Sequence, residues 1–203
     1  MVEIRFIIGD DAYISMTFDE SLDRITMGTQ GKICLWHNNK PIYNLQNRDC
    51  SHTLWDALLR SHDTVDAVLK NTLNVPYRWP SVGYMLNEYF ENPIRHNPKE
   101  DPMATQYLMW SVIQGPATLL YNKDGEIILQ IVPTFDSFIN KISYKIFIRN
   151  YRSYFTRAIP REIAQEWLIK ITEIGQTMLD NYYGDKRPYG VKPIFPDKYV
   201  EEG

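Results

Sequence analysis

Strand patterns and helix patterns occupy separate stretches of this sequence, and no strand–helix–strand alternation connects them. The first fifty residues hold short β-rich runs that are joined by turn signals such as Gly9-Asp10-Asp11 and Asn38-Asn39. The predicted strands are Val2–Ile8, Tyr13–Phe18, Ile25–Met27, Lys32–His37 and Pro41–Leu45. Strands joined by turns this short pair in antiparallel fashion. The sequence therefore begins with a predicted antiparallel sheet.

Strand patterns return in the second half of the chain. Tyr107–Ile113, Ala117–Tyr121 and Glu126–Val132 are the next predicted strands, and Asn122-Lys123-Asp124-Gly125 is the strongest hairpin signal of the sequence. Ile142, Tyr144, Ile146 and Ile148 then alternate with polar residues, which favours one more strand. These runs predict more antiparallel pairing.

Helix patterns lie between and after these strands. The run Thr53–Leu73 has one apolar face, and Thr53 with Asp56 forms a partial capping box; Val82–Phe90 reads as a shorter helix. After Pro160, apolar residues recur every three or four positions up to Gly184, at Ile163, Trp167, Ile171, Ile174, Met178 and Tyr182. The prediction is an α+β fold, with largely antiparallel sheets, helices packed on one face and a long C-terminal helix. Residues 1–184 are predicted to form a single domain and residues 185–203 an extended C-terminal tail.

Composition is that of an ordinary globular protein. Of 203 residues, 44% are hydrophobic and 23% charged, so a chain of this size buries a core without disulfides or metal. The net charge of −3 argues against a dedicated DNA-binding domain, which is usually basic. No apolar run approaches the roughly 18 residues of a membrane span, and the N-terminus does not resemble a signal peptide. We expect a cytoplasmic protein without a membrane partner.

Catalytic and metal-binding motifs are not recognisable. Cys50-Ser51-His52 brings nucleophile and base types together, but sequence neighbours rarely form a catalytic dyad, and a helix-capping segment explains them better. The four histidines have no metal-ligand spacing, and Gly28-Thr29-Gln30-Gly31 lacks the spacing of a phosphate loop. We predict no catalytic residue, cofactor or metal. An enzyme whose site is assembled from distant residues remains a further hypothesis, beside the two binding functions considered below.

Two charged stretches are the candidate contact regions. Between Gly9 and Asp23 all the charged residues are acidic: Asp10, Asp11, Asp19, Glu20 and Asp23. Such a stretch suits a basic partner. From Lys141 to Arg161 all are basic, and aromatic residues are interleaved with them: the cations are Lys141, Lys145, Arg149, Arg152, Arg157 and Arg161. Cations with aromatics suit single-stranded nucleic acid, or an amphipathic element whose aromatics face the core. The Pro-rich segment Asn92–Pro102 is a third, loop-type candidate.

The order of elements resembles a known group of proteins. A strand at Gly31–Trp36, a helix at Leu54-Trp55-Asp56-Ala57-Leu58-Leu59, and a passage from Tyr107 through Gly115-Pro116 into the hairpin Leu119–Ile131 carry the resemblance, followed by the basic-aromatic segment and the long helix. The chain is similar in this order to bacterial immunity proteins, the small cytoplasmic partners encoded beside polymorphic or contact-dependent growth inhibition toxins. The resemblance implies a protein–protein interaction that neutralises a cognate toxin and carries over no catalytic residues. It makes the acidic stretch the expected contact if the toxin domain is basic. The alternative is a nucleic-acid-binding accessory protein that uses residues 141–161.

Overall fold

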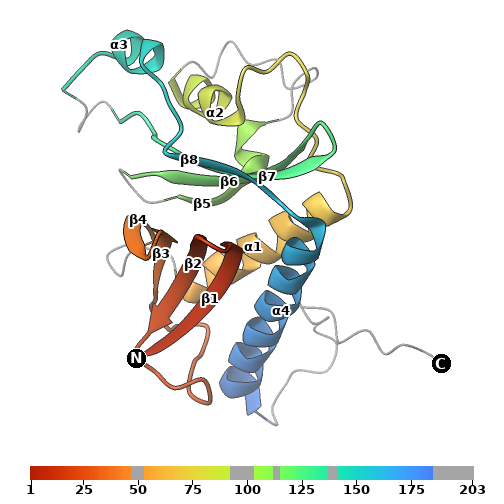
Figure 1. The fold of residues 1–203 in the computed structure, drawn as a ribbon. Helices are drawn as coiled ribbons and strands as arrows, with labels where there is room; N and C mark the ends of the chain where they lie inside the picture. Colours follow the sequence, from red (N-terminus) through yellow and green to blue (C-terminus); the bar gives the residue numbers. More distant parts are fainter. Residues whose placement is uncertain (47–52, 92–102, 112–114, 137–140, 185–203) are drawn as a thin grey trace.

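Two antiparallel sheets organise the protein. The computed structural model describes residues 1–46, 53–91, 103–111, 115–136 and 141–184. In each sheet, strands that are neighbours in sequence are also neighbours in space (Figure 1). The first sheet contains β1 (Val2–Gly9), β2 (Ala12–Phe18), β3 (Lys32–His37) and β4 (Lys40–Gln46). The second contains β5 (Leu108–Ser111), β6 (Ala117–Lys123), β7 (Glu126–Val132) and β8 (Phe155–Ile159).

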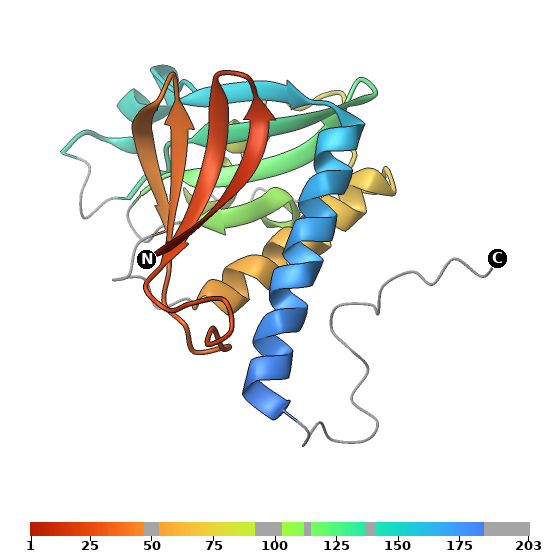
Figure 2. The same ribbon diagram turned by 60° about the horizontal axis from the view of Figure 1, so that its bottom comes forward.

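The helices cover the sheets unequally. In the described part of the chain they are α1 (Leu54–Leu69), α2 (Val82–Glu91), the 3₁₀ helix η2 (Ala104–Tyr107), α3 (Tyr144–Arg149) and α4 (Arg161–Tyr183). α1 and α4 cross in contact, and α4 also touches β1 (Figure 2). α1 lies against β5 and β6, whereas α2 lies on the opposite face of the second sheet (Figure 1). The predicted α+β class and the long C-terminal helix are confirmed, and the second sheet carries helices on both faces.

Local signals in the sequence set several of these boundaries. Thr53 caps α1: its hydroxyl accepts from the Asp56 amide while the Asp56 carboxylate accepts from the Thr53 amide at 3.0 Å. Asp124 and Gly125 join β6 to β7 with φ of 52° and 85°, as the predicted hairpin requires. Gly184 ends α4 with φ of 51°. These features confirm the predicted cap, hairpin and helix stop.

One connected hydrophobic core joins both sheets to α1 and α4. On the first sheet it takes alternate residues of β1 and β2, among them Phe6, Ile14 and Met16. Trp167 of α4 packs edge-on against Phe6, with ring centroids 6.1 Å apart, and its indole N–H donates to the carbonyl of Ile7 at 2.7 Å. On the second sheet, the indole of Trp110 donates to the carbonyl of Ala57 in α1 at 3.2 Å. α1 thus contacts the second sheet and α4 the first.

Three predictions about secondary structure were wrong. Ile25–Met27 lies in the irregular connection from β2 to β3 and is not a strand. The helix predicted to reach Leu73 ends at Leu69. The segment predicted as a strand around Ile142–Ile148 contains the helix α3 instead, and the strand of this region is β8, which was not predicted. Asn92–Pro102, Cys50-Ser51-His52 and the tail from Asp185 lie outside the described residues.

Candidate binding surfaces and a pocket

The five predicted acidic residues lie at the two ends of β2. Asp10 and Asp11 occupy the turn between β1 and β2, whereas Asp19, Glu20 and Asp23 follow β2 in the connection to β3. β2 has 7 residues, so its first and last Cα atoms are about 20 Å apart at a rise of roughly 3.3 Å per residue. The sequence run is therefore two separate acidic groups in space.

Asp11 joins the two predicted charged stretches to each other. Its carboxylate accepts hydrogen bonds from both terminal nitrogens of Arg157 on β8, one of them at 3.0 Å, and lies 2.9 Å from Nε2 of His37. The hydrogen bond from Arg157 is the largest cause that holds the pKa of Asp11 well below its usual range, with a smaller effect from His37. Asp11 and Arg157 thus form an ion pair that connects the first sheet to the second. The two residues are 146 positions apart in the sequence.

Replacing Asp11 with asparagine is expected to lower stability at pH 7, and the loss should shrink as the pH falls toward 3. The folded pKa of Asp11 lies below the ordinary value of 3.8, so the ionised carboxylate stabilises the fold above the ordinary value. That contribution is lost as the pH falls through the ordinary value toward the folded one. Urea unfolding of both proteins at pH 7, 5 and 3 measures the difference. Asp10→Asn, one residue away and exposed, is the control; an equal, pH-independent loss in both variants would contradict the assignment.

The second acidic group is held by the end of α4. The side-chain amide of Asn181 donates to the carbonyl of Leu22 at 3.1 Å and to that of Ile25 at 2.9 Å. A hydrogen bond from Ser21 is the largest cause that lowers the pKa of Asp23. The loop therefore has a fixed attachment to the domain.

Unpaired cations and exposed isoleucines gather around α3. Lys141, Lys145, Arg149 and Arg152 are exposed, and among the described residues none of them forms an ion pair. Ile142 and Ile146 lie among them with 46% and 50% of their surface exposed. We call these six residues the α3 surface. The other two predicted cations are engaged elsewhere, since Arg157 pairs with Asp11 and Arg161 donates to the carbonyl of Leu69.

The aromatic residues of the same segment face the domain. The rings of Tyr144 and Phe147 lie 5.2 and 5.3 Å from that of Phe135, and the ring of Tyr151 lies 6.2 Å from that of Tyr84. The Tyr144 hydroxyl donates to Glu88 of α2 at 2.6 Å, and burial, followed by this hydrogen bond, raises the pKa of Tyr144. Tyr154 differs in being 46% exposed. Most of the aromatic residues that could have stacked on nucleic-acid bases therefore pack inside the domain, where they attach the α3 segment to α2.

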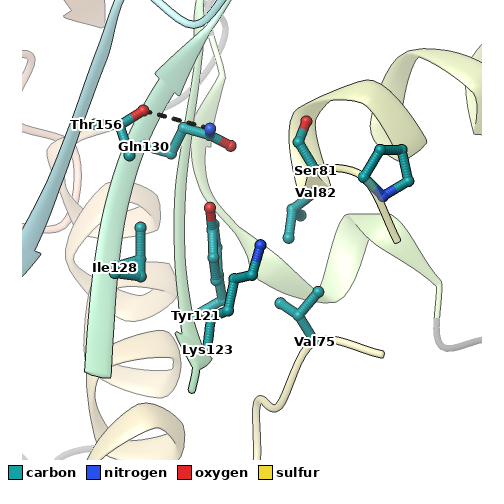
Figure 3. A pocket seen from close by; sticks show the side chains of 9 residues that line it. Val75, Ser81, Val82, Tyr121, Lys123, Ile128, Gln130 and Thr156 are labelled. Carbon is teal, nitrogen blue, oxygen red and sulfur yellow. Dashed lines mark hydrogen bonds between the residues drawn. The ribbon is translucent and has the colours of Figure 1, made fainter. Parts of the chain in front are cut away.

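A cavity of about 200 Å³ lies between the start of α2 and the outer face of the second sheet (Figure 3). Its apolar wall comes from Val75, Pro80, Val82 and Ile128. Its polar side chains are Ser81, Tyr121, Lys123, Gln130 and Thr156, contributed by the start of α2 and by three strands. The sequence alone does not predict this site, because its walls come from segments that are far apart in the chain.

Gln130 leaves a buried acceptor at this cavity. The side chain is 6% exposed, and its Oε1 has no hydrogen-bond partner among the described residues. The amide nitrogen of Gln130 donates to the hydroxyl of Thr156 at 3.4 Å, and this hydroxyl lies 3.0 Å from that of Ser153. Figure 3 shows the amide oxygen turned toward the α2 side of the cavity.

Hydrogen-bond donors lie across from this acceptor. Tyr121 and Lys123 project from the same face of β6, two residues apart, and Tyr121 is opposite Ile128 in the β6–β7 register. Burial raises the pKa of Tyr121 to about 12, so its hydroxyl is protonated at neutral pH. The Lys123 ammonium is turned toward the cavity in Figure 3, and no ion pair engages it within the described part of the chain. Tyr121 and Lys123 can therefore donate hydrogen bonds to an anionic group of a ligand. Oε1 of Gln130 can accept a hydrogen bond from a donor group of the same ligand.

Comparison with protein-family models, with curated proteins and with solved structures finds no match for this chain. Within the described residues, no group of three or more His, Cys, Asp or Glu side chains is placed to hold a metal ion. None of the helices in those residues is long and apolar enough to cross a bilayer.

Proposed function

We propose that this protein is a binding protein that recognises another protein, and that the α3 surface is its contact. The observation that supports this is the grouping, on and beside α3, of two exposed isoleucines with four cations that form no ion pair among the described residues; α3 itself has no buried residue. Apolar side chains surrounded by charge are typical of interfaces in which the apolar centre supplies affinity and the charged rim supplies orientation.

The α3 surface fits a protein better than a nucleic acid. A single strand would require exposed aromatic faces on which bases stack. Tyr144, Phe147 and Tyr151 use their rings against Phe135 and Tyr84 instead. The side chains left outward between the cations are Ile142 and Ile146, which offer a partner apolar area but no aromatic face.

The proposed partner presents acidic residues around an apolar patch. The resemblance to immunity proteins supports the more specific proposal that this partner is a cognate toxin domain, neutralised in the cytoplasm. The predicted contact through Asp10, Asp11, Asp19, Glu20 and Asp23 stays a prediction for a basic toxin domain. Because these residues form two groups, such a domain would meet either the Asp10 end or the Asp19–Asp23 end of β2.

Reversing the charge of Lys145 and Arg149 together is expected to weaken partner binding about 10- to 100-fold, because two favourable contacts become like-charge contacts. The measurement is isothermal titration calorimetry with the product of the adjacent gene, co-expressed and purified. Lys32→Glu/Lys40→Glu, on the first sheet, changes the net charge by the same amount and is the matched control. It should retain the parental affinity.

Three other results are informative. Equal affinity of the α3 variant and the parent would remove the α3 surface from the interface. Loss of binding only on reversal of Asp19, Glu20 and Asp23 would move the contact to the acidic group. The parent protein could instead bind a single-stranded oligonucleotide column in a salt-sensitive way, while the α3 variant does not bind and no protein partner is found. That result would replace the proposal with the nucleic-acid alternative.

A further inference from the structure

The cavity beside α2 contains a buried acceptor that no described residue uses. Buried polar side chains are nearly always hydrogen-bonded, because a buried oxygen without a partner is unfavourable. The amide nitrogen of Gln130 donates to Thr156, and its amide oxygen has no hydrogen-bond partner among the described residues. A ligand group that enters the cavity can donate to this oxygen.

We propose that this cavity binds a small aliphatic carboxylic acid that also carries an O–H or N–H donor. The carboxylate accepts from the Tyr121 hydroxyl and lies near the Lys123 ammonium, and the donor binds Oε1 of Gln130. The aliphatic body contacts Val75, Val82 and Ile128, which line the same space. This proposal is independent of the α3 surface.

The size of the cavity limits the ligand. A volume of about 200 Å³ corresponds to about seven waters at roughly 30 Å³ each, and thus to a ligand of similar heavy-atom number. Short branched hydroxy acids and amino acids have this size, whereas nucleotides and peptides are too large. A ligand so small is expected to bind with a Kd of about 1 mM.

Four related compounds separate the contacts. 2-Hydroxyisovalerate and L-valine have both the carboxylate and a donor, isovalerate lacks the donor, and valinol lacks the carboxylate. Titrations of ¹⁵N-labelled protein followed by NMR should give saturable shifts at Tyr121, Lys123 and Gln130. Both 2-hydroxyisovalerate and L-valine should bind at least about 10-fold more tightly than isovalerate or valinol, the loss expected for one hydrogen bond or one charge contact.

Two variants assign the contacts to residues. Gln130→Leu is expected to weaken 2-hydroxyisovalerate about 10-fold and to leave isovalerate unchanged, because only the former donates to residue 130. The variant should fold, since leucine replaces a side chain whose oxygen is unpartnered. Lys123→Met should weaken both acids and leave valinol unchanged. Gln30→Leu and Lys40→Met, at exposed sites, are the matched controls.

The proposal fails if none of the four compounds gives saturable shifts at the residues lining the cavity by about 10 mM. It also fails if Gln130→Leu weakens isovalerate as much as 2-hydroxyisovalerate, since the residue would then shape the cavity without accepting from the ligand. A water molecule bound to Oε1 of Gln130 that persists during the titrations would likewise overturn it. None of these results bears on partner binding by the α3 surface.

Discussion

Replacing Trp167 with alanine is expected to destabilise the protein by about 3–5 kcal/mol, the usual cost of removing a buried tryptophan. The side chain is 3% exposed, packs against Phe6 and donates to the carbonyl of Ile7. The alanine variant would leave a cavity between α4 and the first sheet and deprive that carbonyl of its donor. Because small domains are stable by about 5–15 kcal/mol, the loss is a large part of the total. Urea unfolding followed by circular dichroism measures it.

Ile169→Ala on the same helix is the matched control. Ile169 is 59% exposed, so its truncation should change the free energy of unfolding by less than about 0.5 kcal/mol. If α4 were only loosely attached to the first sheet, the two variants would have similar stabilities. A loss of native signal in two separate transitions would show that the sheets do not share one cooperative core.

The features that the sequence predicted are those that neighbouring residues determine. The Thr53 cap requires only Asp56, three positions away, and the β6–β7 hairpin requires only residues that tolerate positive φ at Asp124 and Gly125. The periodicity of α4 is long enough to exclude a strand, and its stop at Gly184 is local as well. These local signals also indicate the order of strands and helices along the chain, and this order predicts the fold class.

The α3 segment was predicted wrongly because its sequence carries two patterns. Ile142, Tyr144, Ile146 and Ile148 alternate as in a strand, but Tyr144, Phe147 and Tyr151 recur at helical spacing. The helical pattern prevails because the rings of Tyr144, Phe147 and Tyr151 pack against those of Phe135 and Tyr84. Both of these partners lie outside the segment, so the segment's own sequence does not show them. Short β8 depends in the same way on pairing with β7, where Phe155 lies opposite Ile131.

The basic stretch that contains the α3 surface was predicted, whereas the split of the acidic run and the cavity were not, for a related reason. The acidic run looks continuous in sequence, yet the seven residues of β2 separate its two groups, and Arg157 neutralises Asp11 from another sheet. The cavity requires the start of α2 to lie over β6 and β7, about forty to fifty positions later in the chain. The available signal was weak: Tyr121 and Lys123 follow the apolar Ala117 and Leu119 on one face of β6.

Gly83 allows α2 to approach the second sheet closely enough to form that cavity. A Cβ at this position would overlap the Tyr151 hydroxyl oxygen and lie 2.6 Å from Cγ1 of Val132. The helix cannot simply move away, because Asn87 ties it to the end of β7. The Asn87 side chain donates to the carbonyl of Pro133 at 3.0 Å and accepts from the amide of Phe135 at 2.7 Å. A side chain at residue 83 must therefore displace Tyr151 and Val132.

Gly83→Ala is accordingly expected to destabilise the protein by about 2 kcal/mol, although alanine is the better helix former. Overpacking of this kind costs about 1–3 kcal/mol and sometimes more, whereas the gain in helix propensity is about 1 kcal/mol. Thermal and urea unfolding measure the net effect. Gly28→Ala, where a Cβ would meet nothing closer than 3.8 Å, is the control and should be nearly neutral.

A second substitution tests whether the clash itself is the cause. Tyr151→Phe removes the oxygen that the new Cβ would overlap, and alone it should change stability by less than about 1 kcal/mol, since that hydroxyl is buried without a hydrogen bond of normal geometry. In the Gly83→Ala background the same change should restore part of the lost stability. The contact with Val132 remains, so rescue should be incomplete. Strictly additive effects would mean that residues 83 and 151 do not touch, and α2 would then lie farther from the sheet than the cavity requires.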